Sequence, residues 1–166
     1  MEVVRHAEIW NGIAVSDATL TRAARAAFAA VSPARRESCE ATLVLTDDEE
    51  TRALNRTWRG KNSSTNVLSF PAGEPAAAIP GEPRPLGDVV LAAETVLVEA
   101  RDKSVSVADH VTHLVVHGML HLLGFDHERD EDALAMETLE TKVLAGLGIA
   151  DPYAENARAD AQEVSP

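Results

Sequence analysis

The stretch SVADHVTHLVVHGMLHLLGFDH, residues 106–127, carries the strongest structural signal in the chain. Its apolar residues recur at helical spacing, and Ser106 stands where an N-capping hydroxyl is expected. Gly124 stands where helices commonly end in a left-handed residue. The pattern therefore predicts one long apolar helix between these two residues, followed by a turn.

Three histidines of this stretch, His117, His121 and His127, are candidate metal ligands. The first two are four residues apart, so a helix places both imidazoles on one face, about 6 Å apart along its axis. The turn at Gly124 can bring His127 back toward them, which completes the spacing H-x-x-x-H-x-x-G-x-x-H of the metzincin ligands. Unpaired imidazoles in so apolar a helix would be costly, and metal ligation removes that cost.

This ligand set favours a catalytic zinc site over a structural one. Structural zinc sites usually close with four protein ligands, mostly cysteines, and the single cysteine here, Cys39, is far away in the sequence. Three neutral imidazoles leave the ion its 2+ charge and a fourth coordination position for water. An ion of this kind activates the bound water and polarises a bound substrate oxygen. Zincin proteases carry glutamate directly after the first histidine, whereas this chain has Gly118, so a peptidase of that kind would lack its base.

Two neighbours of the candidate ligands have roles that the pattern leaves open. Asp126, next to His127, is either a base or a contact that orients a ligand, or else a cap of the turn. His113, one turn before His117, either contacts substrate, supports the ligands, or is a satisfied core or surface histidine.

The overall composition indicates one globular domain. The 166 residues are 45% apolar and 25% charged, and the lone cysteine excludes an intrachain disulfide framework and suits a reducing compartment. The first residues do not read as a signal peptide, and no window approaches the roughly 20 apolar residues of a membrane helix. We therefore expect a cytoplasmic protein without a membrane partner.

The charge is distributed unevenly. A net charge of −12 argues against nucleic-acid binding through bulk electrostatics, and residues 128–166 hold ten acidic and only three basic side chains. Residues 51–61, in contrast, hold no acid and four bases, which are Arg52, Arg56, Arg59 and Lys61. This local basic cluster is either a solvated helix face or a track for a nucleic-acid backbone.

Shorter patterns place the remaining elements. Apolar runs predict strands, and helical periodicity predicts helices, with strands at residues 1–5, 41–46, 66–70 and 87–92 and helices at 16–31, from Asp47 onward, at 94–102 and at 130–145. Five prolines and two glycines in residues 71–85 favour a surface loop over a functional lid. Strands and helices interleave around one core, which indicates an α+β or α/β domain over residues 1–150, with a small mixed sheet and a polar, flexible tail at 151–166.

Three blocks of sequence together resemble a known family. HGMLHLLGFDH (117–127), NRTWRGKNSSTNVLSFP (55–71) and LGDVVLA (86–92) occur in the order found in the YbeY family of bacterial metal-dependent endoribonucleases. The resemblance covers about residues 1–148, and the histidine block is its most specific part. It implies an α+β single domain in which a small mixed four-stranded sheet packs with helices, with a zincin-like core.

The resemblance also implies a function and a set of site residues. The expected activity is zinc-dependent, single-strand-specific endoribonucleolytic cleavage in maturation of the 16S rRNA 3′ end and in ribosome quality control. One zinc ion per chain is expected on His117, His121 and His127, with Arg59 as the family's arginine facing the site. Asn66 occupies a position where members often carry aspartate, so the role of this side chain is open.

RNA cleavage agrees with these residue types. Negative charge builds up at the phosphorus, and a guanidinium such as that of Arg59 offers a planar two-pronged donor for phosphate oxygens. The nucleophile is either water activated by the metal or the 2′-hydroxyl of the RNA. For the neighbouring Trp58 we expect a core anchor, with stacking on an unpaired base as the alternative.

A second hypothesis belongs to a different functional class. The chain would be a metal-stabilised ribosome-assembly factor that binds rRNA or a small-subunit ribosomal protein, with little catalysis of its own. Its acidic surface fits docking to a basic ribosomal protein.

Overall fold

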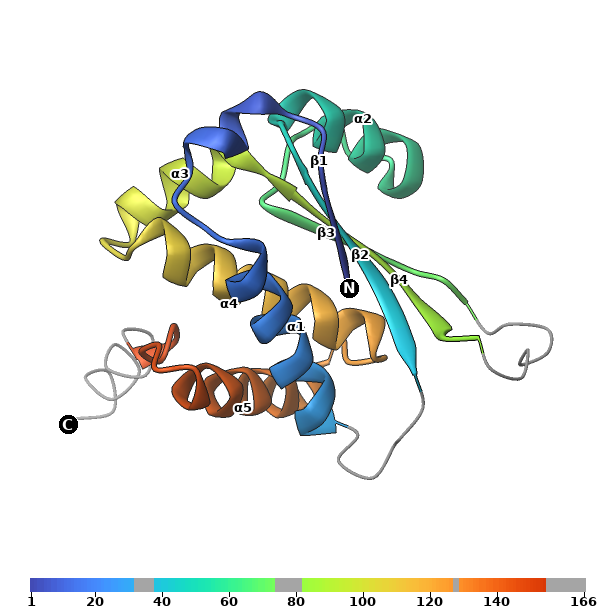
Figure 1. Ribbon diagram of the computed structural model, residues 1–166, viewed down its shortest axis with the longest axis vertical. Helices are drawn as coiled ribbons and strands as arrows, with labels where there is room; N and C mark the ends of the chain where they lie inside the picture. The colour runs from blue at the N-terminus through green and yellow to red at the C-terminus, as the bar shows by residue number, and fades with distance from the viewer. Residues whose placement is uncertain (32–37, 74–81, 127–128, 155–166) are drawn as a thin grey trace.

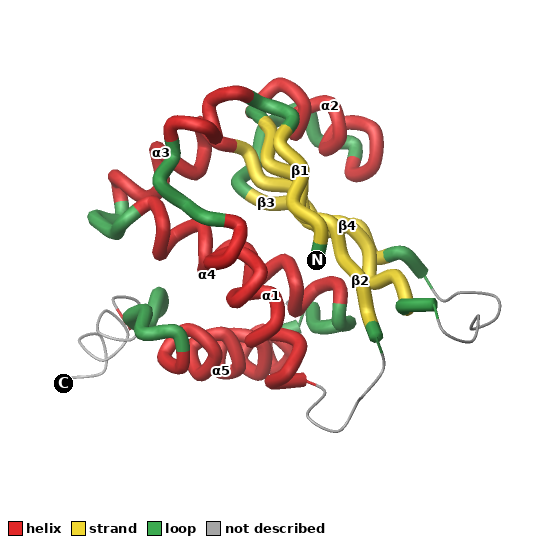
Figure 2. The backbone as a smooth tube through the Cα atoms, in the orientation of Figure 1, coloured by secondary structure: helices red, strands yellow, loops and turns green. Residues whose placement is uncertain are grey.

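The computed structural model describes residues 1–31, 38–73, 82–126 and 129–154 of the chain. Three parts of the sequence expectations lie outside these residues: the ligand His127, residues 74–81 of the proline-rich loop, and residues 155–166 of the expected tail. Figure 1 shows the chain from its N-terminus to its C-terminus, and Figure 2 shows the same view by secondary structure.

A mixed four-stranded sheet forms the centre of the fold (Figure 2). Its strands lie in the order β1 (Glu2–Arg5), β2 (Cys39–Thr46), β4 (Arg84–Ala92) and β3 (Val67–Pro71). The first three are parallel, and β3 pairs antiparallel with β4 at the edge of the sheet. The α+β class with a mixed four-stranded sheet is therefore confirmed, and it is consistent with a zincin-like core.

Helices lie on both faces of the sheet, and one face carries more of them than the other (Figure 1). The helices are a short 3-10 turn η1 (Glu8–Gly12) and α1 (Asp17–Val31), α2 (Asp48–Arg59), α3 (Ala93–Asp102), α4 (Val107–Leu122) and α5 (Asp130–Gly146). α4 packs on β3 and β4 and also contacts α1, α3 and α5, whereas α2 packs on β4. Figure 1 shows α2 on the side of the strands opposite to α1, α4 and α5.

The strongest local signals in the sequence are confirmed. The Ser106 hydroxyl caps α4 by accepting a hydrogen bond from the Asp109 amide, and the Asp47 carboxylate caps α2 by accepting from the Glu50 amide. Gly124, just after α4, has a left-handed φ of 93°, a backbone conformation that would be strained in a residue with a side chain. The proline-rich stretch is shorter than expected, because β3 extends into it at Pro71 and β4 begins at Arg84.

α4 is the central helix of the core. Ten of its 16 residues are buried, and the partly exposed His113, His117 and His121 are among the few that are not. No helix in the described part of the chain is long and apolar enough to cross a membrane.

Gly118 lets α4 approach the sheet closely. A Cβ atom at this position would lie 2.6 Å from Cγ1 of Val89 on β4 and 3.2 Å from Oγ of Ser69 on β3. The Ser69 hydroxyl also donates a hydrogen bond to the Gly118 carbonyl, at 3.1 Å. The glycine that replaces the protease glutamate is therefore a packing residue, and the structure has no room for a larger side chain there.

Replacing Gly118 with alanine is expected to lower the free energy of unfolding by about 1–3 kcal/mol, because overpacking against Val89 outweighs the better helix propensity of alanine. The matched control is Gly146→Ala at the end of α5, where no atom lies within 4 Å and a small gain of up to about 1 kcal/mol is expected. Urea unfolding of both variants measures these changes. Similar effects at the two positions would contradict a tight contact at Gly118.

Candidate functional site

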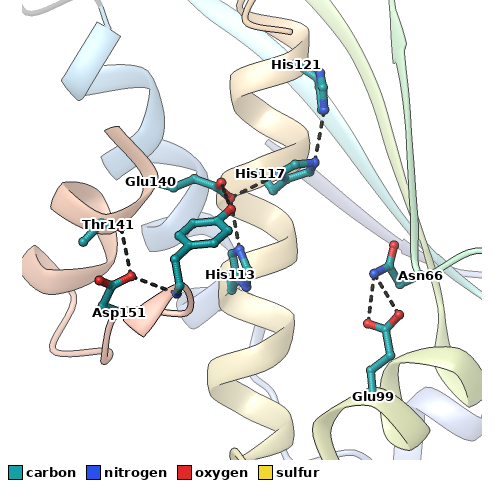
Figure 3. A network of polar contacts seen from close by, with 9 residues as sticks. Asn66, Glu99, His113, His117, His121, Glu140, Thr141 and Asp151 are labelled. Atoms are coloured by element: carbon teal, nitrogen blue, oxygen red, sulfur yellow. Dashed lines mark hydrogen bonds and ion pairs between the residues drawn. The ribbon is translucent and has the colours of Figure 1, made fainter. Parts of the chain in front are cut away.

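His117 and His121 point toward each other from consecutive turns of α4 (Figure 3). Their Nε2 atoms are 3.1 Å apart. Two ligands of one zinc ion, each bonded at about 2.1 Å, can lie at most about 4.2 Å apart. The observed separation lies within that limit, so these two rings fit one shared ion without a change of rotamer.

The other ring nitrogens determine the tautomers of both histidines. Nδ1 of His117 lies 3.1 Å from a carboxylate oxygen of Glu140, and Nδ1 of His121 lies 3.0 Å from the Phe125 carbonyl oxygen. A carbonyl or ionised carboxylate only accepts hydrogen bonds, so each Nδ1 carries a hydrogen, and Nε2 is the ring atom left to bind a metal ion. A divalent metal ion can be held between the two Nε2 atoms, whereas without a metal one Nε2 donates a hydrogen bond to the other. The donor set therefore fits a divalent metal ion.

The turn after α4 supplies the partner of His121. The Gly124 amide donates to the His121 carbonyl and the Phe125 amide donates to the Leu120 carbonyl, both at 3.0 Å, which turns the chain back toward the helix. Asp126 follows as an exposed residue, and the next position is His127. Among the described residues, no third histidine, cysteine or carboxylate completes the pair as a metal site. The third ligand thus stays a prediction.

Glu140 of α5 is a buried carboxylate beside the two histidines (Figure 3). Its Oε1 accepts from Nδ1 of His117 and from Nε2 of His113, both at 3.1 Å, and its Oε2 accepts from the Tyr153 hydroxyl at 2.5 Å. Burial alone would raise the pKa of Glu140, but the hydrogen bonds from His113, His117 and Tyr153 outweigh it and lower the pKa to about 2. The site therefore contains a permanent negative charge next to His117.

Glu140 and Tyr153 are functional-site residues that were not predicted from the sequence, although the sequence holds a signal for Glu140. Glu140 follows Met136 by four residues and precedes Val143 and Leu144, so it stands on the apolar stripe of its own helix. An acid at such a position is rare unless it has partners. His113, whose role was open, is one of those partners and is satisfied by Glu140.

Arg59 and Trp58 end α2 in a different layer of the fold. Within the described part of the chain, Arg59 makes no hydrogen bond or ion pair with His117 or His121, so the structure does not bring the predicted arginine into direct contact with them. Trp58 is 70% exposed, and its ring meets the Phe70 ring of β3 in an edge-to-face arrangement with 6.2 Å between ring centroids. The expected core anchor is therefore wrong, because Trp58 ends the helix on its solvent side.

Comparison with known proteins decides the family. The family model described as Endoribonuclease YbeY matches residues 8–148. The chain belongs to the YbeY family. It is 46% identical over 165 residues to the "Endoribonuclease YbeY" of Rhodopseudomonas palustris strain BisA53, a match that covers 99% of this chain and 95% of that protein. It is 50% identical over 146 residues to that of Azorhizobium caulinodans, covering 87% and 90%.

The fold is also similar to a solved structure. The solution structure of TM1509 from Thermotoga maritima superimposes with a TM-score of 0.55 at 21% sequence identity, over 99% of this chain and 95% of that one. At this identity the likeness concerns the fold alone. It agrees with a single domain of the observed architecture.

Asn66, whose role the sequence leaves open, lies in a separate polar cluster (Figure 3). Its amide donates to both carboxylate oxygens of Glu99 on α3, and its own oxygen accepts from the Val67 amide. Nε2 of His110 donates to the same carboxylate at 2.7 Å. Asn66 thus links the start of β3 to α3, and its polar atoms are engaged within the fold.

His110 is expected to make stability depend on pH. Burial of the His110 ring lowers its pKa, and the hydrogen bond to Glu99 raises it. Burial is the larger effect, so the pKa lies below the ordinary value of 6.5. As the pH falls through 6.5, the unfolded chain takes up a proton here that the folded chain does not yet bind, so the folded state loses stability.

The corresponding variant is His110→Gln, which cannot titrate and keeps an amide donor for Glu99. We expect its free energy of unfolding to fall less than that of the wild type between about pH 8 and about pH 5. Urea unfolding in the presence of a chelator measures both slopes without a metal contribution. Equal slopes would show that His110 is not held neutral by burial.

Proposed function

We propose that the chain is a zinc-dependent endoribonuclease specific for single-stranded RNA, with one zinc ion on His117, His121 and His127. The observation that carries the proposal is the pair of Nε2 atoms 3.1 Å apart, on two rings whose Nδ1 atoms each face an acceptor. Membership of the YbeY family supports an RNA substrate, and the family resemblance supports maturation of the 16S rRNA 3′ end, ribosome quality control and a cytoplasmic location.

Zinc in this position supplies a Lewis acid for the scissile phosphate. The residues of the chain then have distinct tasks. His117 and His121 hold the ion through Nε2, with their rings fixed through Nδ1. Arg59 binds phosphate oxygens and stabilises the charge that develops during cleavage. Either water or the 2′-hydroxyl serves as the nucleophile, and cyclic phosphate ends would identify the hydroxyl.

The edge strand β3 connects the metal-binding helix to the basic end of α2. Ser69 on β3 contacts Gly118 of α4, and the next residue, Phe70, contacts Trp58 of α2. Successive residues of a strand point to opposite faces, so the two contacts lie on the two sides of β3. An RNA strand that crosses this edge would reach both the histidines and the cations of the cluster, which are Arg52, Arg56, Arg59 and Lys61.

The decisive experiment measures zinc content and RNA cleavage in nuclease-free preparations. We expect one zinc per chain in the wild type and its loss, together with loss of cleavage, in His117→Ala and His121→Ala. Arg59→Ala should keep the zinc and lower the cleavage rate by about 100- to 1,000-fold, a range typical for loss of one charge-stabilising donor. The matched control is Arg101→Ala, which removes an exposed arginine from the last turn of α3.

Two results would contradict the proposal. A wild-type protein that binds no zinc under any loading condition would exclude the metal centre. Identical residual cleavage in Arg59→Ala, His121→Ala and the wild type would show that a contaminant cleaves the RNA, and would favour the assembly-factor hypothesis.

Trp58 is suited to stack on an unpaired base, because its ring is exposed and cations surround it in the sequence. Trp58→Ala should weaken binding of a single-stranded RNA by about 1–3 kcal/mol, and Trp58→Phe should weaken it much less. Fluorescence anisotropy with labelled single-stranded and duplex RNA measures both. Leu134→Ala, at another exposed apolar residue, is the control, and an equal change in Leu134→Ala and Trp58→Ala would contradict stacking.

One observation favours a protein partner in addition. A hollow of about 600 Å³ is lined by three carboxylates, those of Glu2, Glu40 and Asp88, and by no lysine or arginine among its described residues. Phe70 contributes an apolar wall. Such a site suits a basic segment of a protein, which supports a small-subunit ribosomal protein as partner, either of the nuclease or of an assembly factor with little catalysis.

A further inference from the structure

We propose that Glu140 is the positioning residue of the metal centre and that it fixes the tautomer and ring orientation of His117, with Tyr153 as its own anchor. The inference rests on the proposed metal site and names a residue outside the ligand set. Glu140 does not touch the ion or the RNA in this role. It acts through His117.

Glu140 is a buried carboxylate in the core. Its side chain is 1% exposed, and the neighbouring Met136 and Leu144 on the same helix are core residues. A buried carboxylate is tolerated only where hydrogen-bond donors compensate for its lost hydration. If those donors are removed, the unpaired charge strongly destabilises the folded protein. Glu140 has three donors from two separate parts of the chain, so the surrounding structure is built around this carboxylate.

The two carboxylate oxygens of Glu140 have different partners. Oε1 accepts from two imidazoles one helical turn apart, His113 and His117, while Oε2 accepts from Tyr153 (Figure 3). With both oxygens engaged, the carboxylate cannot rotate away from His117. His113 therefore helps to hold the Glu140 carboxylate in place. This contact gives a role to a histidine of α4 that is not a candidate metal ligand.

Tyr153 is itself held in place after α5. Its amide donates to Oδ1 of Asp151 at 2.9 Å, and the Thr141 hydroxyl donates to the same oxygen at 3.1 Å (Figure 3). Burial and the hydrogen bond to Glu140 raise the pKa of the Tyr153 hydroxyl, so it remains a donor. A continuous series of hydrogen bonds thus leads from the segment after α5 to Nδ1 of His117.

The chemistry of metal ligands supplies the reason for this arrangement. A histidine that binds a metal through Nε2 commonly donates its Nδ1 hydrogen to a carboxylate or a carbonyl, which selects the tautomer and makes the ring a stronger donor to the metal. His121 obtains this from the Phe125 backbone, and His117 obtains it from Glu140. Loss of such a partner typically weakens metal binding by about 10- to 100-fold.

The test compares three variants of the full chain by two measurements. Glu140→Gln keeps the shape of the side chain but turns an acceptor into a donor, and Tyr153→Phe removes only the hydroxyl that anchors it. Glu99→Gln is the matched control, because Glu99 also accepts from a histidine of α4, His110, but not from a ligand. Competition with a chromophoric chelator gives the zinc dissociation constant, and long-range nitrogen–proton NMR gives the tautomer of His117 in the zinc-free protein.

We expect the zinc dissociation constant to rise by about 10- to 100-fold in Glu140→Gln and by a smaller factor in Tyr153→Phe. Glu99→Gln should bind zinc like the wild type. The His117 spectrum should show hydrogen on Nδ1 in the wild type and a mixture of tautomers in Glu140→Gln. A purely structural role of Glu140 would lower the melting temperature without changing the tautomer.

Each other outcome has a definite meaning. Unchanged zinc affinity and tautomer in a folded Glu140→Gln would overturn the inference, and so would an equal loss of affinity in Glu99→Gln. If Glu140→Gln does not fold, Tyr153→Phe decides by the same two measurements, and wild-type values for both would reject the role. A wild type that binds no zinc would instead reject the proposed metal centre, while the tautomer measurement still tests the contact between Glu140 and His117.

Discussion

The close contact between α4 and the sheet is the constraint on which the rest of the molecule depends. Gly118 allows the helix backbone to lie against Val89 and Ser69, and this places the neighbouring His117 at a fixed height above the sheet. The opposite side of the same helix packs against α1 and α5, so α4 cannot shift without disturbing the core. The two imidazoles are therefore presented by one of the most constrained elements of the fold, which suits a site that must hold its ligands in place.

Local signals in the sequence were sufficient for most of the elements. The capping residues Ser106 and Asp47 and the left-handed Gly124 each act within a few residues of chain, so their effect does not depend on the rest of the fold. The same holds for His117 and His121, because spacing along a single helix fixes which side chains are neighbours. Fold class and this half of the site could thus be predicted before any coordinates.

Contacts between distant segments could not be predicted from the sequence. Trp58 was expected in the core because large aromatic residues usually pack inside, but only the arrangement of α2 on the sheet decides which side of the helix meets solvent. Glu140 meets His117 through the packing of α5 on α4, and Asn66, the residue before β3, meets Glu99 of α3, 33 residues later in the chain. Periodicity indicates which face of a helix is buried, but it does not identify what that face touches.

The hydrogen bonds around Glu140 also set an order of assembly during protein synthesis. His117 meets its acceptor only after 23 more residues have been added, and that acceptor meets Tyr153 only 13 residues later. A growing chain that already contains all three histidines therefore still lacks the groups that orient the first of them. The proposed metal centre therefore gains the contacts that orient its first ligand only after α5 and the segment that follows it have been made.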